Sequence, residues 1–284
     1  MKPRLAASIA ALALVVSGCS SSATPTPSLT PATSAPTAPA ASAAATGAPA
    51  NVTIYGAASL GAVLARMKTV YEAANPGTTL TISTDSSSAL ETKIEQGAPV
   101  DVFLSADTTN PQKLVDKGLA AGSLVKFAGN LLAVIVPTAN PAGIQTPADL
   151  AKSGVKIIAA GATVPITKYA SQLVANLAKQ PGYPADFAAK YAANVVSKQD
   201  NVAAVVTQIE LGEGDAAIVY VTDAKTSTKV ATIAVPATAN VPATYSGVVV
   251  KASANAAAAQ AFMTWLAGPD GQAVLASSGF LPAS

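Results

Sequence analysis

The sequence predicts an α/β fold with mixed, mostly parallel β-sheets, and three observations lead to that prediction. Between residues 51 and 118, short apolar runs alternate with segments of helical periodicity, the order typical of parallel strands joined by helices. The same alternation returns between 155 and 221. Two apolar strands that end in proline, near 131–137 and 230–236, separate these regions and suit paired crossings between two lobes.

Residues 1–18 are predicted to form a signal peptide. Lys2 and Arg4 precede the apolar run Leu5–Val16, which is too short to span a membrane. The following Val16-Ser17-Gly18-Cys19 resembles the lipobox of bacterial lipoproteins, so we expect Cys19 to carry a lipid anchor. Cys19 is the only cysteine, which excludes disulfides within the chain and thiolate metal sites.

Residues 19–50 are predicted to form a lipidated, disordered linker. After Cys19 this segment consists mainly of Ala, Pro, Ser and Thr, and it carries no charged residue. Such a composition buries too little apolar surface to offset the entropy of ordering. The ordered part therefore begins near Asn51 and has roughly 230 residues, enough for one large or two smaller domains.

Charge and composition exclude several classes of function. The chain has 17 basic and 15 acidic residues, and because Lys2 and Arg4 belong to the leader, the mature chain is close to neutral. No basic stretch is present for nucleic-acid binding. The absence of histidine excludes Ser-His and Cys-His catalysis and histidine metal sites, so we expect neither catalytic residues nor direct metal ligands.

The first region is predicted to contain three strand-helix pairs. Ser59 is expected to cap the first helix, Ser88 with Glu91 fits a capping box at the second, and Asp107 is expected to cap the third. Glycine or proline follows each helix. We expect strands at 52–55, 79–83 and 101–105, and helices at 60–71, from the serine run 86–88 to Gly97, and after Asp107 to Gly118.

The second region and the tail are predicted from the same patterns. Asp200-Asn201 can cap a helix that carries Val202 and ends at Gly212. Further helices are expected at 167–177, around Phe187 and Tyr191, and at 256–267 and 269–279, with strands at 131–136, 155–159, 195–196, 216–221, 230–235 and 245–250. The predicted lobe one is 51–132 plus 237–284, lobe two is 137–231, and the hinge lies near 133–136 and 232–236.

Two serines mark a candidate ligand site. Ser59 and Ser87 both follow parallel strands and stand at the start of a helix, so both should lie at the carboxyl edge of the sheet. Free N–H groups and the helix dipole favour an anion there. Plain helix capping is the alternative for the serines, and a core position is the alternative for Tyr220, which ends a buried strand.

An ordered set of motifs resembles the molybdate-binding lipoproteins of bacterial ABC importers over residues 51–284. The set comprises VTIYGAASL at 52–60, SSS at 86–88, IEQGAP at 94–99, FLSAD at 103–107, VP at 164–165, IVY at 218–220 and SGF at 278–280. The resemblance implies a two-lobed periplasmic binding protein of the second topological type, with a two-strand hinge. It also implies a non-enzymatic, monomeric receptor on the outer face of the cell membrane, which delivers molybdate or tungstate to an ABC permease.

The same resemblance implies which residues hold the oxyanion. They are the hydroxyls of Ser59 and Ser87 from lobe one, and the backbone amides of Ile166 and Val202 with the Tyr220 hydroxyl from lobe two. A tetrahedral dianion can be stabilised by such neutral, preoriented donors without Arg or Lys. No cofactor is expected besides the ligand itself.

Two residues depart from the family pattern, and three other functions remain open. We expect the Asp85 side chain to point away from the ligand and Lys168 to face solvent. One alternative is a receptor for another tetrahedral oxyanion, such as sulfate. A second is a lipid-anchored serine hydrolase that uses one of Ser86–Ser88 with Lys93 as base, although the chain lacks a G-x-S-x-G elbow. A third is a purely structural surface lipoprotein.

Overall fold

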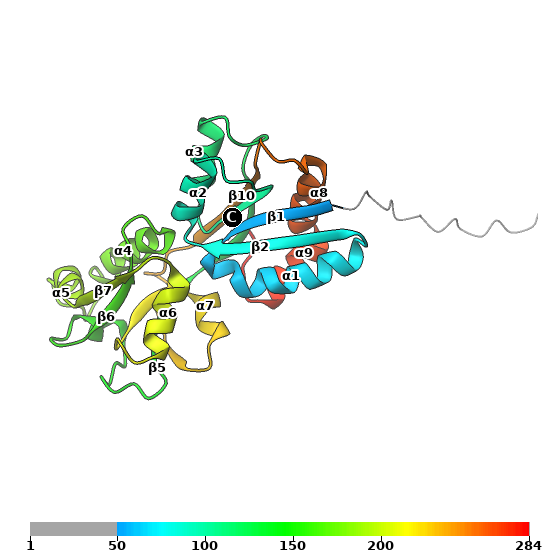
Figure 1. The fold of residues 1–284 in the computed structure, drawn as a ribbon. Helices are drawn as coiled ribbons and strands as arrows, with labels where there is room; N and C mark the ends of the chain where they lie inside the picture. Colours follow the sequence, from blue (N-terminus) through cyan, green and yellow to red (C-terminus); the bar gives the residue numbers. More distant parts are fainter. Residues whose placement is uncertain (1–49, 284) are drawn as a thin grey trace, which may run out of the picture. The chain divides into compact units, whose positions relative to one another are not determined.

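The computed structural model describes residues 50–283 (Figure 1). The predicted signal peptide 1–18, the predicted lipidation at Cys19 and almost all of the predicted linker 19–50 lie outside the described residues.

The first sheet has five strands in the order β2-β1-β3-β10-β4 (Figure 1). The central strand β3 has the sequence VFLS and is buried at all four positions, the near-continuous apolar run typical of a strand covered on both faces. β1 pairs in parallel with β2 and β3, while β10 runs antiparallel to β3 and β4. The strands are β1 (Ala50–Ala57), β2 (Thr78–Asp85), β3 (Val102–Ser105), β4 (Val125–Asn130) and β10 (Ala243–Val249).

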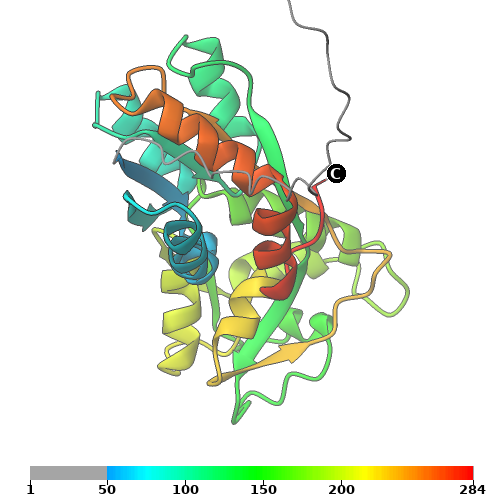
Figure 2. The same ribbon diagram turned by 90° about the vertical axis from the view of Figure 1, so that its right-hand side faces the viewer.

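Helices cover both faces of this sheet. One face packs against α1 (Gly61–Ala74), α8 (Ala256–Ala267) and α9 (Pro269–Ser277), which lie side by side in Figure 2. The other face packs against α2 (Ser87–Glu95) and α3 (Thr109–Asp116), which form a separate apolar cluster. The carboxyl ends of the parallel strands β1, β2 and β3 lie together at one edge of the sheet, where η1 (Ala58–Leu60) and α2 begin.

The second region, built from two smaller sheets, follows β4. One has the order β8-β5-β9 and the other pairs β6 with β7, and a parallel bridge from Ile157 to Ala216 connects them. The strands are β5 (Leu132–Pro137), β6 (Ile157–Ala160), β7 (Val195–Gln199), β8 (Ala217–Tyr220) and β9 (Val230–Ile233). The helices are η2 (Pro147–Ala151), α4 (Pro165–Leu177), α5 (Phe187–Ala193), α6 (Val202–Glu210) and α7 (Val221–Thr226).

The predicted α/β class is confirmed, but the sheets are less parallel than expected. β5 runs antiparallel to both β8 and β9, and β10 is antiparallel to both of its neighbours. The strand-helix alternation fixes the direction only of strands joined directly by a helix, whereas β10 returns to the first sheet after the whole second region. The sequence analysis also missed β4 and α7.

One segment predicted at the hinge lies within a strand, and the other begins at the end of one. Residues 133–136 belong to β5 and 232–233 to β9, and these strands pair with each other, Val134 opposite Ile233. The strands of the first sheet fall within 50–130 and 243–249, and those of the other sheets within 132–233. The division into two lobes that move about a hinge stays a prediction.

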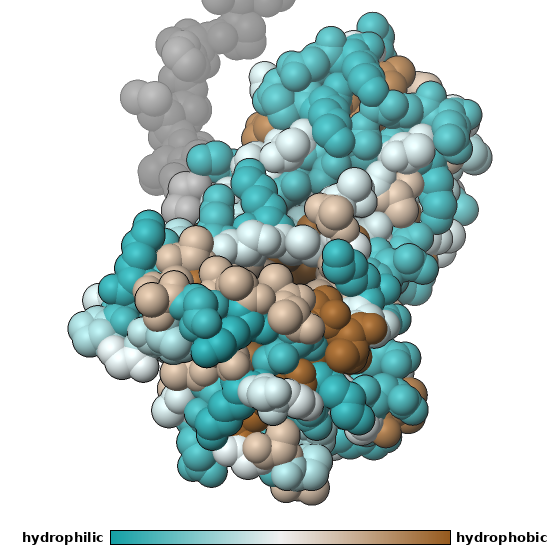
Figure 3. Space-filling view, turned by 90° about the vertical axis from the view of Figure 1, so that its left-hand side faces the viewer, coloured by the Kyte–Doolittle hydropathy of each residue, from teal (hydrophilic) through white to brown (hydrophobic). Residues whose placement is uncertain are grey.

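Large apolar side chains are scattered over the surface of the described residues. Within residues 50–283, no helix combines the length and the apolar character needed to cross a bilayer. The face in Figure 3 is largely hydrophilic, with apolar residues in small areas. Among the described residues, the exposed large hydrophobic side chains come from separate elements and loops: Val70, Val196, Leu211 and Leu281.

Replacing Gly247 by Ala is expected to destabilise the fold. A Cβ atom at Gly247, in β10, would lie 2.6 Å from Leu104 Cδ2 and 2.8 Å from the Phe103 carbonyl oxygen. Because the carbonyl is part of the neighbouring strand, the sheet must shift, at a cost of about 1–3 kcal/mol. Urea unfolding followed by circular dichroism measures this change.

Gly61→Ala is the matched control for this prediction. Gly61 is the first residue of α1, and a Cβ atom there meets nothing within 4 Å. The control should leave the unfolding free energy unchanged or raise it by up to about 1 kcal/mol. Equal stability of the Gly247→Ala variant and the wild type would contradict the packing described for β3 and β10.

Candidate functional site

The carboxyl edge of the first sheet and the second region enclose a small cavity. Its volume is about 10 Å³. All five predicted site residues line it, together with small and apolar neighbours, and none of the lining side chains is charged: Ala57, Ala58, Ser59, Ser86, Ser87, Ala106, Val164, Pro165, Ile166, Val202 and Tyr220. The structure thus brings the predicted residues together, and their binding role stays a prediction.

Ser59 is held by a tyrosine that the sequence analysis did not select. Ser59 lies in η1 and is buried, and its Oγ accepts a hydrogen bond of 2.9 Å from the Tyr245 hydroxyl. The predicted N-cap role of Ser59 is wrong, because a 3₁₀ turn follows β1 and α1 begins only at Gly61, with Leu60 as its N-cap. The Ser59 hydroxyl therefore does not cap α1, and it can donate its hydrogen to another acceptor.

Ser87 is the first residue of α2 and is almost completely buried, with 1% of its surface exposed. Its Oγ accepts a hydrogen bond of 3.1 Å from the backbone N–H of Ala106. The N-cap is Ser86, whose Oγ accepts from Ala89 N at 3.3 Å. The capping box predicted for Ser88 and Glu91 is therefore wrong, since the helix starts two residues earlier than that box requires.

Two further helix starts supply backbone amides. Pro165 is the first residue of α4, which suits its missing N–H, and Ile166 is the second. Val202 is the first residue of α6, and the N-cap Asn201 accepts a hydrogen bond of 3.0 Å from Ala204 N. The first N–H groups of a helix have no partner within it, so Ile166 and Val202 offer donors where their residues line the cavity.

Tyr220 carries a buried hydroxyl without a partner. It ends β8, is 1% exposed, and its Oη has no hydrogen-bond partner within the described residues. Burial raises the pKa of Tyr220 well above its ordinary value, so the phenol remains a neutral donor. A buried polar atom left unpaired costs about 1–3 kcal/mol, which makes this hydroxyl the strongest indication of a ligand in the cavity.

The Asp85 carboxylate, at the edge of the site, has three partners. Its Oδ1 accepts from Ser86 N at 2.8 Å and from Asn201 Nδ2 at 3.3 Å, and its Oδ2 lies 3.2 Å from Lys93 Nζ. Burial raises the pKa of Asp85, but these three donors outweigh that effect and hold it below its ordinary value. Asp85 does not line the small cavity, as expected for a carboxylate next to an anion site.

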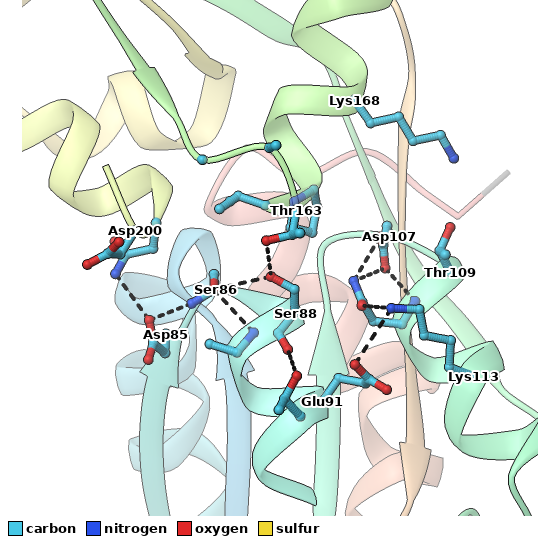
Figure 4. A pocket seen from close by; sticks show the side chains of 18 residues that line it. Asp85, Ser86, Ser88, Glu91, Asp107, Thr109, Lys113, Thr163, Lys168 and Asp200 are labelled. Carbon is cyan, nitrogen blue, oxygen red and sulfur yellow. Dashed lines mark hydrogen bonds and ion pairs between the residues drawn. The ribbon is translucent and has the colours of Figure 1, made fainter. Parts of the chain in front are cut away.

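A wider groove of about 790 Å³ adjoins the cavity and shares three lining residues with it: Ser86, Val164 and Pro165. Figure 4 shows its polar lining, with Ser88 Oγ 3.4 Å from Thr163 Oγ1 across the groove. The Lys168 side chain extends away from that contact. The charged side chains near the site, including Asp85 and Lys168, line this groove and not the cavity.

Thr108 occupies the N-cap position of α3, but Asp107 supplies the side-chain acceptor expected of a cap. Its Oδ1 accepts a hydrogen bond of 3.0 Å from Asn110 N at the start of α3, and Ser105 Oγ donates to it at 2.8 Å. Within residues 50–283, no group of three or more Asp, Glu or Cys side chains is placed to hold a metal ion.

The sequence analysis missed two residues behind Ser59. They are Tyr245 in β10 and Asn130 at the end of β4, which are both buried. Asn130 was overlooked because β4 as a whole was not predicted, and no local pattern distinguishes Tyr245 from a core residue. Only the tertiary structure brings them next to Ser59, 186 positions from Tyr245 along the chain.

The fold, with hydroxyls and helix starts around an uncharged cavity, suits the binding of a small ligand. Residues 52–281 match the family model described as bacterial extracellular solute-binding protein. The match spans most of the chain, and the chain therefore belongs to this family, whose members act outside the cytoplasm.

Individual relatives and a solved structure agree with this membership. The chain is 30% identical over 231 residues to the molybdate-binding protein ModA of Mycobacterium tuberculosis, covering 81% of this chain and 84% of the relative. It is 30% identical over 240 residues to ModA of Haemophilus influenzae, covering 82% and 91%. The periplasmic molybdate-binding protein of Azotobacter vinelandii superposes with a TM-score of 0.70 at 25% identity, covering 82% of this chain and all of that one. The predicted fold family is thereby confirmed.

Asp223 is a buried acid directly behind the site. It lies in α7, and its Oδ2 accepts a hydrogen bond of 3.2 Å from the backbone N–H of Tyr220. Burial raises the pKa of Asp223 to about 7, and that hydrogen bond offsets only part of the effect.

We expect Asp223 to make the protein less stable as pH rises from about 4 to about 7. In this window the folded protein holds a proton on Asp223 that the unfolded chain, with the ordinary pKa of 3.8, has released. The unfolding free energy therefore falls with rising pH, by at most about 4 kcal/mol, and changes no further above the folded pKa. Urea unfolding at several pH values measures this slope.

The Asp223→Asn variant should lose this part of the slope, because an amide has no proton to release and its oxygen can still accept from Tyr220. Asp270→Asn, at an exposed position of α9, should retain it. Identical pH profiles for Asp223→Asn and the wild type would show that Asp223 does not titrate in this range.

Proposed function

We propose that this chain is a non-enzymatic receptor that binds molybdate or tungstate outside the cytoplasmic membrane and delivers it to an ABC permease. The observation that carries the proposal is the Tyr220 hydroxyl, which is buried and unpaired in a cavity whose lining bears no charged side chain. A small ligand that only accepts hydrogen bonds suits this cavity best.

The donors around the cavity fit a tetrahedral dianion. Ser59 and Ser87 each accept a hydrogen bond from the protein, from Tyr245 and Ala106, so their own hydrogens are available to the ligand. The amides of Ile166 and Val202 add donors at two helix starts, where the helix dipole favours negative charge. Several such hydrogen bonds to an ionised oxygen are stronger than neutral ones, and no lysine or arginine is required.

The relatives favour molybdate among the tetrahedral dianions. Two curated relatives at 30% identity and the solved structure from Azotobacter vinelandii carry names that state molybdate binding. Tungstate has nearly the same size and charge, so a cavity of this kind should accept both. The five predicted site residues that line the cavity come from both predicted lobes, which suits closure of the lobes around the anion.

We further propose that the receptor is a lipid-anchored monomer. The resemblance of residues 16–19 to a lipobox supports lipidation of Cys19 after removal of residues 1–18, and the linker 19–50 then connects lobe one to the membrane. The two lobes are 51–132 with 237–284, and 137–231, with the hinge near 133–136 and 232–236.

Sulfate is the second candidate, because the same uncharged hydrogen-bond donors also suit a smaller tetrahedral dianion. The serine hydrolase alternative has less support. Lys93, the base that it requires, is half exposed and ion-paired with Asp85, and no histidine is available.

Molybdate and tungstate are expected to stabilise the protein against heat. A ligand present at about 100 times its dissociation constant raises the unfolding free energy by roughly 2.7 kcal/mol, provided that it binds only the folded state. Thermal unfolding with molybdate, tungstate, sulfate and phosphate measures the shift. The absence of a shift with both molybdate and tungstate would refute the proposal, and a shift with sulfate alone would favour the second candidate.

Two neighbouring serines provide the matched pair of variants. Ser87→Ala removes a hydroxyl that lines the cavity and should weaken molybdate binding in calorimetry by roughly two- to tenfold or more. Ser88→Ala removes a hydroxyl that lines only the wider groove, and its affinity should stay close to that of the wild type. Equal losses in both variants would argue against the assigned cavity.

A further inference from the structure

Asn130 has a side-chain amide whose orientation is fixed by the backbone. Its Oδ1 accepts a hydrogen bond of 3.0 Å from the N–H of Leu131, a group that can only donate. The amide nitrogen must therefore lie on the opposite side, where it donates to Thr222 Oγ1 at 2.8 Å and to Tyr245 Oη at 3.4 Å. Asn130 is thus a donor, and not an acceptor, toward Tyr245.

The hydrogen bond from Asn130 fixes the direction of the hydrogen bond between Tyr245 and Ser59. Because its Oη accepts from Asn130, its own hydrogen is directed to the other neighbour, Ser59 Oγ, at 2.9 Å. Burial raises the pKa of Tyr245 well above its ordinary value, so the hydroxyl keeps its hydrogen. The ring is fully buried and held by edge-on contacts with Phe127, Tyr220 and Phe280, which leave the hydroxyl little freedom to move.

Ser59 is therefore an acceptor toward Tyr245 and can donate its hydrogen only elsewhere. Ser59 lines the cavity, whereas Tyr245 and Asn130 do not, so these two residues act through Ser59. Ser87 has the same arrangement, because it accepts from the backbone N–H of Ala106. Each serine accepts a hydrogen bond from the protein, and its own O–H can therefore donate to a ligand in the cavity.

We infer that Tyr245, oriented by Asn130, is a specificity-determining positioning residue that makes Ser59 a hydrogen-bond donor to the bound anion. This inference rests on the proposed function and deepens it. A fully ionised oxyanion accepts from every donor in the cavity. An oxyanion that carries a hydroxyl, such as phosphate near neutral pH, must also donate, and Ser59 held in this way is a poor acceptor for it.

The variant Tyr245→Phe tests the inference, because it removes one oxygen and keeps the ring contacts. Without the donated hydrogen bond, Ser59 can turn and present a lone pair to the cavity. Molybdate should then bind roughly two- to tenfold more weakly, the range expected for one neutral hydrogen bond. Phosphate should lose less affinity or gain some, so the ratio of the phosphate to the molybdate dissociation constant should fall at least about twofold.

The ratio of the phosphate to the molybdate dissociation constant distinguishes a positioning role of Tyr245 from a purely structural one. Molybdate is titrated by calorimetry at pH 7.5, and phosphate is measured by competition against molybdate on the same sample, so that any loss of folded protein cancels. Tyr71→Phe is the control, since it removes another buried tyrosine hydroxyl, in α1, that does not line the cavity. This control should keep the wild-type ratio.

The possible results are distinct. Failure of the wild type to bind molybdate would refute the proposed function itself. If the wild type binds and Tyr245→Phe keeps the wild-type ratio, including the case in which phosphate competes with neither protein, the inference is wrong. A reduced ratio in Tyr245→Phe, with an unchanged ratio in Tyr71→Phe, supports it.

Discussion

The site depends on one constraint: hydrogen-bond donors are buried around a cavity from which charged side chains are excluded. Leaving the Tyr220 hydroxyl unpaired costs about 1–3 kcal/mol, a large part of the stability of an ordinary domain. Folding alone gives no reason to keep such a group. The cost is recovered when an acceptor enters, and the same physics accounts for the free hydrogens of Ser59 and Ser87.

The charges near the site are arranged so that they do not interfere. Asp85, which would repel a dianion, is neutralised by Lys93 and by donors from Ser86 and Asn201, and it faces the wider groove. Its contact with Asn201 also connects the end of β2 to the N-cap of α6, the helix that presents the Val202 amide. A residue that departs from the family pattern thus joins the two halves of the site.

Much of this could be predicted from the sequence, because the signals are local. Helical periodicity and the residues that end strands indicated the elements that carry Ser59, Ser87, Val202 and Tyr220, and the family resemblance selected these positions. Cap positions were less predictable, since a 3₁₀ turn precedes α1 and the N-cap of α2 lies two residues before the predicted one. Tyr245 was beyond local patterns, because its partner Ser59 lies 186 residues away.

A crystal structure of the protein with molybdate is the most direct test of the central claim. The account predicts that the anion occupies the small cavity, with its oxygens within hydrogen-bond distance of Tyr220 Oη, Ser59 Oγ, Ser87 Oγ and the amides of Ile166 and Val202, and with no lysine in contact. An anion bound in the wider groove against Lys168 or Lys113, or a Tyr220 hydroxyl still unpaired beside the bound anion, would contradict it.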